Sequence, residues 1–229
     1  MERSKRLGRL RHALLERLVH YYYFVTEQQE HGCGDTVTST RIARLMQMDD
    51  TLVRKDLAAI GVRGYPRVGF KCSEVADAIR KVLGFDETYR AVIIGIGWLG
   101  SAMASYRGFS RYGLEICGLF DCDPVKIGLM RDNLVVLPME RLPLVVRQQG
   151  VSMAILTVPV DAAQEVADFA VAAGVKAIWN FASTNLELAE AVLVRHEHIS
   201  VGLAELGYQL KQAGAAGPPD APAGKEAEA

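Results

Sequence analysis

Short apolar runs alternate with amphipathic stretches over most of the chain beyond residue 85. Each run is rich in Val, Ile and Leu and has the length of a buried strand. The expected strands are 91–94, 114–120, 134–137, 151–158 and 175–181, with a final short pair near 191–194 and 199–201. Helices are expected between them, at 139–149 and 162–173. This alternation predicts an α/β fold, a doubly wound parallel sheet of the Rossmann type that binds ligands at the carboxyl ends of its strands.

Before residue 85 the apolar positions follow the helical period instead. The helices are expected at 5–29, 40–46, 51–60 and 73–83. Ser39 is the expected N-cap of the second helix, and Asp49 or Asp50 is that of the third. Residues 84–87 form the expected junction to the α/β part.

The second and third of these helices are joined by a tight turn, and the third is basic. This is the arrangement of a helix-turn-helix, whose second helix enters the major groove of DNA. Arg54 and Lys55 then face bases or phosphates, and Ser39 and Thr40 complete the expected contacts. An ordinary three-helix bundle whose basic residues face water is the alternative.

The stretch 61–71 favours the DNA-binding interpretation. Its glycines, proline and aromatic residues predict a small β-hairpin that presents three cations, Arg63, Arg67 and Lys71. Such a wing follows the phosphate backbone or places an arginine in the minor groove. A helix-turn-helix followed by a cationic hairpin is a winged-helix domain, which we expect over residues 1–84.

A glycine motif lies where the first strand of the α/β part turns into a helix. Gly95, Gly97 and Gly100 form the pattern G-x-G-x-x-G. The first glycine permits the tight turn, the second lets the backbone approach a pyrophosphate, and the third lets the helix pack on the strand. The N–H groups that begin the following helix then face the phosphates. A glycine-rich turn without a ligand is the alternative.

The next expected strand ends in Asp121, at the distance from the motif where a carboxylate accepts hydrogen bonds from an adenosine ribose. An acid there favours NAD over NADP, because it repels a 2′-phosphate. The loops Thr157-Val158-Pro159 and Asn180-Phe181 fall at the same edge of the sheet and are the expected nicotinamide side of the pocket. Residues 85–202 thus form the expected dinucleotide-binding domain.

The net charge of −1 hides an uneven distribution. Lys and Arg outnumber Asp and Glu in residues 1–84, and acids outnumber bases afterwards, so only the first part is expected to meet a polyanion. No apolar run approaches the roughly 18 residues of a membrane span. No signal-type core follows the N-terminus, and we expect a cytoplasmic protein.

The remaining candidates for chemistry are few. The cysteines form no C-x-x-C pair and are expected to be free thiols. His196 and His198 have no further ligand at metal-binding spacing, so no metal site is expected. A last short helix is expected at 203–212, and the tail 213–229 is too rich in Ala, Gly and Pro to bury a core and is expected to be disordered.

Motifs along the chain, taken in order, resemble those of the redox-sensing transcriptional repressors called Rex. They are Val53-Arg54-Lys55-Asp56-Leu57, Arg67-Val68-Gly69-Phe70, Gly95-Ile96-Gly97-Trp98-Leu99-Gly100, Phe120-Asp121-Cys122-Asp123-Pro124, Thr157-Val158-Pro159 and Trp179-Asn180-Phe181-Ala182. Several motifs in one order are far more specific than any one of them. The likeness extends over nearly the whole of the expected folded chain.

The resemblance implies a repressor that holds palindromic operator DNA with NAD+ bound or with no cofactor, and releases it when NADH binds. It also implies a homodimer in which the helix at 203–212 swaps between subunits. Tyr106 matches a family tyrosine near the nicotinamide ring. The implied cofactor-binding residues are Gly95, Ile96, Gly97, Trp98, Leu99, Gly100, Tyr106, Asp121, Asp123, Thr157, Val158, Pro159, Asn180 and Phe181.

Two other functions are alternatives. An NAD-dependent dehydrogenase needs a general acid or base near the nicotinamide. The chain beyond Asp121 has room to complete the sheet but not for a substrate domain, so no catalytic residue is expected. A regulator that binds CoA is the second alternative, since the α/β part also resembles CoA-binding domains.

Overall fold

The computed structural model describes residues 12–31 and 34–215, which form two compact units. The first unit comprises the described residues up to Tyr89 together with Tyr106–Glu115. The second comprises Arg90–Ser105 and the described residues from Ile116 onward. The segment 106–115 therefore contacts the first unit, although its place in the sequence is within the expected dinucleotide-binding domain.

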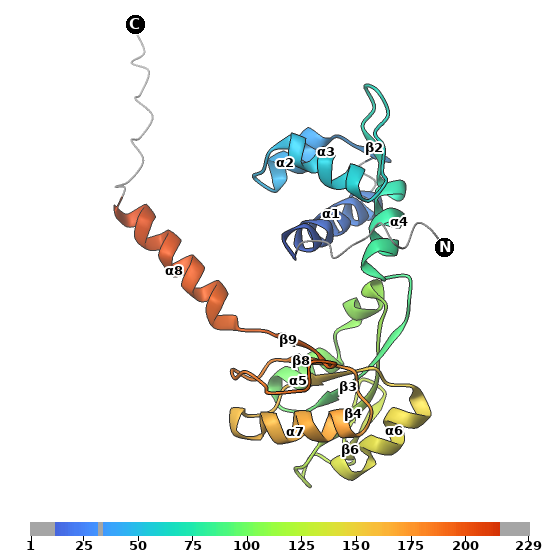
Figure 1. Cartoon of the computed structure of the whole chain (residues 1–229), viewed down its shortest axis with the longest axis vertical. Coiled ribbons are helices and arrows are strands. Elements are labelled where there is room, and N and C mark those ends of the chain that lie inside the picture. Colours follow the sequence, from blue (N-terminus) through green and yellow to red (C-terminus); the bar gives the residue numbers. More distant parts are fainter. Residues whose placement is uncertain (1–11, 32–33, 216–229) are drawn as a thin grey trace, which may run out of the picture. The chain divides into compact units, whose positions relative to one another are not determined.

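Helices build the first unit (Figure 1). They are α1 (His12–Glu30), α2 (Ser39–Leu45), α3 (Asp50–Ala59) and α4 (Cys72–Leu83), with the 3-10 helix η2 (Arg107–Tyr112) from the inserted segment. Their apolar faces meet in one core, in which Leu18, Tyr21 and Ile42 are completely buried. All four expected helices are confirmed in the described residues, and residues 5–11 of the first lie outside them.

The N-caps of α2 and α3 follow the same chemistry. Of the two predicted caps of α3, Asp49 is the one observed, because its carboxylate accepts the N–H groups of the first turn. The prediction that Ser39 caps α2 is wrong by one residue. Thr38 has the extended backbone of a cap, and its hydroxyl accepts the N–H of Arg41 at 3.2 Å.

The wing follows α3 and differs from the predicted hairpin in its pairing. A single bridge joins Tyr65 to Gly69, and β2 (Phe70–Lys71) then pairs with β1 (Thr36–Val37), which precedes α2. Gly69 has a φ of +96°, and an added Cβ would collide with the carbonyl oxygen of Val37. The strand before α2 thus approaches the wing too closely for any residue but glycine.

A buried ion pair fastens α3 to α1. Asp56 is 5% exposed and accepts hydrogen bonds from Nε and Nη2 of Arg17 at 2.7 and 3.0 Å. The hydroxyl of Tyr21 donates to the same carboxylate at 3.0 Å. Burial and this bond to Asp56 raise the pKa of Tyr21, so it stays a donor. A buried carboxylate is tolerated here because three donors satisfy it.

Among the described residues, seven strands form the sheet of the second unit, in the order β5-β6-β4-β3-β7-β8-β9. They are β3 (Tyr89–Ile94), β4 (Leu114–Asp121), β5 (Met130–Arg131), β6 (Leu134–Pro138), β7 (Met153–Leu156), β8 (Ala177–Asn180) and β9 (Leu193–His196). The pairs β4–β6, β3–β7, β7–β8 and β8–β9 are parallel. From β3 the chain runs outward to β6 and then returns to β7 on the other side, which is the doubly wound order predicted.

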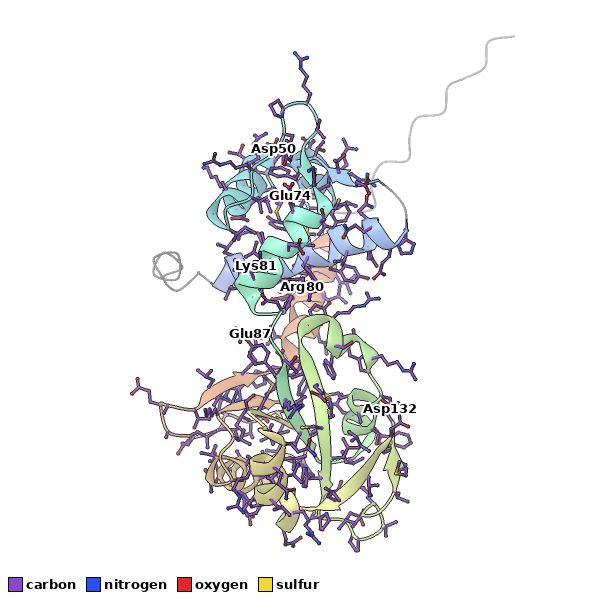
Figure 2. All side chains as sticks on the ribbon, turned by 90° about the vertical axis from the view of Figure 1, so that its right-hand side faces the viewer. Asp50, Glu74, Arg80, Lys81, Glu87 and Asp132 are labelled. Carbon is purple, nitrogen blue, oxygen red and sulfur yellow. The ribbon has the colours of Figure 1, made fainter. Side chains whose placement is uncertain are left out.

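One antiparallel pair stands at the edge of this sheet. Asp132 and Asn133 join β5 to β6, both with positive φ, at +41° and +69° (Figure 2, where Asp132 is labelled). Asn and Asp tolerate this left-handed backbone, which a two-residue hairpin turn requires. The pair adds a short antiparallel edge to a sheet that is otherwise parallel in its paired strands.

The first three helices of the second unit bury one face in it and follow the expected positions, whereas the described side chains of the last helix are exposed. These helices are α5 (Trp98–Ala104), α6 (Leu142–Gln149) after the short 3-10 helix η3 (Met139–Arg141), α7 (Val160–Ala172) and α8 (Ile199–Ala215). The strand expected at 199–201 is wrong, because those residues form the first turn of α8. A short apolar run alone does not distinguish a strand from a helical turn. The helix also continues to Ala215, beyond the expected end, and residues 216–229 lie outside the described part.

We expect Arg17→Met to lower the free energy of unfolding by about 2–4 kcal/mol, because the change leaves the buried Asp56 without its cation. Methionine keeps the apolar stem, so packing changes little. Urea unfolding followed by circular dichroism measures the loss. Arg111→Met is the matched control: Arg111 pairs with Glu30 at 3.2 Å, but both side chains are more than half exposed. Loss of this exposed pair should lower the free energy of unfolding by about 0.5 kcal/mol or less. Equal decreases in the two variants would contradict the prediction.

Candidate functional site

Three glycines build the turn at the carboxyl end of β3, and they do not play the same part. Gly95 has a φ of +95°, and an added Cβ would lie 2.8 Å from the side chain of Val158. Gly100 is buried, and its Cβ would collide with the carbonyl oxygen of Gly95. Gly97 is exposed, with no atom within 4 Å of an added Cβ. Two glycines thus close the turn, and the third leaves open space beside bare backbone, as a bound pyrophosphate requires.

Thr157 holds this turn from the neighbouring strand. It follows β7, and its N–H donates to the carbonyl of Ile94 at 3.0 Å. Its hydroxyl donates to the carbonyl of Gly95 at 2.6 Å. The order of the sheet reverses between β3 and β7, so this contact lies at the switch point, where doubly wound sheets bind their ligands.

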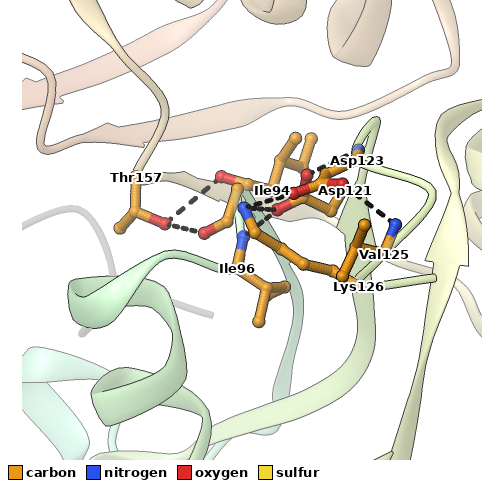
Figure 3. A network of polar contacts seen from close by, with 8 residues as sticks. Ile94, Ile96, Asp121, Asp123, Val125, Lys126 and Thr157 are labelled. Carbon is orange, nitrogen blue, oxygen red and sulfur yellow. Dashed lines mark hydrogen bonds and ion pairs between the residues drawn. The ribbon is translucent and has the colours of Figure 1, made fainter. Parts of the chain in front are cut away.

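Asp121 holds the turn from the other side, at the end of β4. Its side chain is nearly buried, at 5% exposure. Oδ2 accepts the N–H of Ile96 at 2.7 Å and Nζ of Lys126 at 3.0 Å, and Oδ1 accepts the N–H of Asp123 at 2.9 Å (Figure 3). A carboxylate oxygen accepts two hydrogen bonds. Oδ1 therefore keeps the capacity for one more, which fits a ribose hydroxyl.

Opposing effects act on the pKa of Asp121. Burial raises the pKa, but the hydrogen bonds from Asp123, Lys126 and Ile96 outweigh it and hold the pKa below its ordinary value. The carboxylate is therefore ionised at neutral pH. The ionised carboxylate can therefore accept a ribose hydroxyl at the remaining site on Oδ1, and it repels a bare phosphate.

Sequence reasoning missed Lys126. Oδ1 of Asp123 accepts the N–H of Val125, and the carbonyl of Asp123 accepts the N–H groups of Lys126 and Ile127. This turn brings the ammonium of Lys126 back to Asp121 and within 3.8 Å of Oδ2 of Asp123 (Figure 3). The available signal was the Asp-Pro start of the turn, which places a lysine three residues later on the same side.

Asn180 ends β8 at the same edge of the sheet and is completely buried. Its Nδ2 donates to the carbonyls of Ala182 and Thr184 at 3.2 and 2.8 Å, and its Oδ1 accepts the N–H of Ala182 at 3.0 Å. Asn180 therefore shapes the loop that carries Phe181, whose ring centre lies 5.0 Å from that of Trp179. The side-chain amide of Asn180 thus holds this loop in place through its hydrogen bonds to the loop backbone.

The other expected cofactor residues are spread more widely. Ile96 is buried beneath the turn, Val158 is half-buried beside it, and Pro159 precedes α7. Leu99 is exposed, and the indole of Trp98 is 98% exposed at the start of α5. Tyr106 packs on Phe109, with ring centres 5.0 Å apart, in the segment that belongs to the first unit. The structure thus gathers the turn, Asp121, Asp123 and Thr157 in the second unit, whereas Tyr106 belongs to the first unit.

In the first unit, α3 presents the expected basic face. Val53 and Leu57 point into the core, whereas Arg54 and Lys55 are exposed. Arg54 pairs with Asp50 one turn earlier at 2.9 Å, where both side chains reach solvent (Figure 2 labels Asp50). Exposed pairs of this kind contribute little, so Arg54 exchanges Asp50 for an anionic partner at low cost.

The residues that begin α2 have different environments. Thr40 is exposed, whereas Ser39 is only 8% exposed. Of the two predicted contacts, Thr40 is therefore the one whose side chain lies at the surface.

The cations of the wing also differ from one another. Arg63 and Arg67 are exposed, and Arg67 lies at the turn with a φ of +62°. Nζ of Lys71 lies 3.2 Å from Glu74 and 5.1 Å from the ring centre of Tyr65, whose hydroxyl donates to Glu74 at 3.0 Å (Figure 2 labels Glu74). The bond to Glu74 raises the pKa of Lys71. Lys71 thus braces the base of the wing, while Arg67 is presented at its tip.

The described residues bear on three further expectations, which concern the cysteines, metal binding and membrane spans. Cys72, Cys117 and Cys122 are free thiols, as predicted, and Cys33 lies outside this part. The described residues contain no group of three side chains placed to hold a metal ion. None of the helices within 12–31 and 34–215 has the length and apolar character of a membrane span.

Two family models match the chain. A model described as a CoA-binding domain matches residues 86–184, and one described as a putative DNA-binding protein N-terminus matches residues 12–58. The first covers the glycine turn and the sheet strands through β8. The second covers α1, α2 and most of α3.

The chain is also similar to curated redox-sensing transcriptional repressors named Rex. It is 38% identical over 189 residues to the Rex of Treponema denticola, which covers 82% of this chain and 90% of that protein. It is 39% identical over 200 residues to the Rex of Carboxydothermus hydrogenoformans, which covers 87% of this chain and 96% of that protein.

Solved structures agree with these sequences. The crystal structure of RSP, a Rex-family repressor, superposes with a TM-score of 0.81 at 31% identity and covers 91% of this chain and 97% of that one. RSP in complex with NADH has a TM-score of 0.82 at 30% identity, with the same coverage. RSP in complex with NAD+ and operator DNA has a TM-score of 0.81 at 30% identity, covering 91% and 95%. Relatives more than 30% identical over most of the chain, with the same fold and ordered motifs, show that this protein belongs to the Rex family of redox-sensing transcriptional repressors.

Proposed function

We propose that this protein represses transcription according to the NADH/NAD+ ratio: it binds operator DNA with NAD+ or without cofactor and releases it when NADH binds. One observation carries this function. A winged-helix unit that exposes Arg54 and Arg67 is joined in one chain to a sheet whose switch point holds Gly97 and the ionised Asp121. The related RSP binds NADH, NAD+ and operator DNA, and the curated relatives are repressors, so this chain is a repressor rather than an enzyme.

The chain's own residues divide the work of holding the dinucleotide. The bare backbone at Gly97 faces the pyrophosphate, and Asp121 accepts from the adenosine ribose. Pro159 and Phe181 supply apolar surface for the nicotinamide. The oxidised ring carries a positive charge that the reduced ring lacks, and an apolar pocket favours the uncharged form. Each cofactor shifts the repressor between its DNA-binding and released states only by as much as its affinities for those two states differ.

We also propose that the protein acts in the cytoplasm as a homodimer on palindromic operators. Helix α8 supports the dimer, because its large apolar residues are exposed in the single chain: Val201, Leu203, Leu206, Tyr208 and Leu210. A second copy that exchanges this helix covers them. Two-fold symmetry then places the half-sites about one helical turn apart, or a multiple of it.

We expect fluorescence anisotropy on labelled DNA from upstream of the protein's own gene to report tight binding that NADH abolishes and NAD+ does not. The salt concentration is held constant, because phosphate contacts make the affinity salt-dependent. CoA is added in place of NADH as the control, since residues 86–184 match a CoA-binding domain model. Release by CoA but not by NADH would assign the site to another ligand, and binding indifferent to both would refute the sensor.

We expect Gly97→Ala to leave the unfolding temperature within about 2 °C of the wild type while weakening NADH binding at least about tenfold, because its methyl enters space that the pyrophosphate needs. Gly100→Ala is the matched variant. Its methyl meets the carbonyl of Gly95, so it should cost about 1–3 kcal/mol of stability. Differential scanning fluorimetry and NADH titration separate the two effects. Unchanged NADH affinity in Gly97→Ala would remove the pyrophosphate from this position.

We expect Arg54→Ala to cost about 1–3 kcal/mol of operator affinity and to relax one base position, as loss of a contact to a guanine edge does. Affinities for a set of single-base operator variants measure both effects. Arg147→Ala, at the end of α6 in the second unit, is the control and should leave them unchanged. A loss that is uniform across all sequences would instead make Arg54 a phosphate contact.

A further inference from the structure

The cation of Lys126 lies beside Asp121, the carboxylate that is expected to bind the adenosine ribose. Nζ of Lys126 is 3.0 Å from Oδ2 of Asp121 and 3.8 Å from Oδ2 of Asp123. Its side chain is 34% exposed, against 5% for Asp121, so the ammonium forms the outer wall of this network (Figure 3). The backbone of the turn fixes this position, since the carbonyl of Asp123 accepts the N–H of Lys126 at 3.0 Å.

This cation changes the electrostatics of the ribose end. An acid alone at this place repels a 2′-phosphate, whereas a nearby basic side chain accommodates one. Here Asp121 shares one oxygen with Lys126, so much of its charge is neutralised. An ammonium has three N–H donors, of which one meets Asp121 and a second is directed toward the more distant Asp123. A third remains for a phosphate oxygen.

We propose that Lys126 is a specificity-determining residue of the nucleotide site, which brings the affinity for NADPH closer to that for NADH than Asp121 alone would allow. The inference rests on the proposed function in one respect: the site binds an adenine dinucleotide. Asp123 acts in the opposite direction, because its half-exposed carboxylate adds a negative charge beside Lys126. The balance between Lys126 and Asp123 therefore sets how strongly the site excludes a phosphorylated ribose.

Isothermal titration calorimetry on the full-length protein tests this with NADH and NADPH. A second pair of probes, 5′-AMP and adenosine 2′,5′-bisphosphate, isolates the adenosine end. We expect Lys126→Gln to raise the ratio of Kd for NADPH to Kd for NADH about tenfold, because it removes a positive charge a few ångströms from the 2′-phosphate. Lys126→Arg keeps the charge and should leave the ratio within about twofold.

Two further variants complete the design. Lys176→Gln makes the same charge change just before β8. It lies at the amino ends of the parallel strands, opposite the carboxyl ends where Asp121 lies, and it should leave the ratio unchanged. Asp123→Asn removes a negative charge while keeping an oxygen that accepts the N–H of Val125, so the ratio should fall several-fold. If Lys126→Gln does not fold, the ratio measured for Asp123→Asn tests the proposal in its place.

The outcomes separate this inference from the proposed function. A wild-type protein that binds neither NADH nor NAD+ overturns both. NADH binding with a ratio that stays the same in Lys126→Gln and in Asp123→Asn overturns only the role of Lys126. If the Kd ratio changes equally for both probe pairs, the effect lies at the adenosine ribose. A change confined to the dinucleotides would contradict that location.

Discussion

The hydrogen bond from the N–H of Ile96 to the carboxylate of Asp121 is the contact on which the proposed nucleotide site depends. It joins the glycine turn after β3 to the end of β4, at 2.7 Å and almost out of contact with water. Thr157 fixes the same turn from β7. Because the turn is held from both neighbouring strands, these contacts fix the bare backbone at Gly97. A site that is organised beforehand loses less conformational freedom when it binds.

The DNA-binding unit uses a second buried carboxylate in the same way. Asp56 fastens the inner face of α3 to α1 through Arg17 and Tyr21, which leaves Arg54 and Lys55 on the outer face. Both buried acids are tolerated because several donors satisfy each of them. In each unit, therefore, a buried acid positions the surface that we propose binds an anion: cofactor phosphates in one unit and DNA in the other.

The course of the chain provides the physical connection that a sensor requires. Helix α5 begins at the glycine turn and leads directly into the segment Tyr106–Glu115, which belongs to the DNA-binding unit. Within that unit, Tyr112 packs on Tyr22 of α1, with ring centres 6.2 Å apart, and on Phe85 at 5.1 Å. One continuous piece of backbone thus runs from the cofactor turn into the winged-helix core.

The sequence by itself determined the fold class, the helices of the first unit and the place of the glycine turn, because periodicity, capping and turn signals are local properties of the chain. Tertiary structure decided what depends on distant partners: β2 pairs with β1 across α2 and α3, residues 106–115 join the first unit, and Lys126 folds back on Asp121. Local patterns also misjudged residues 199–201, whose apolar run suits either a strand or a helical turn. The reason is the same in each case: a residue's spacing along the chain predicts its own conformation, whereas its partner is selected by packing, charge and space in the folded molecule.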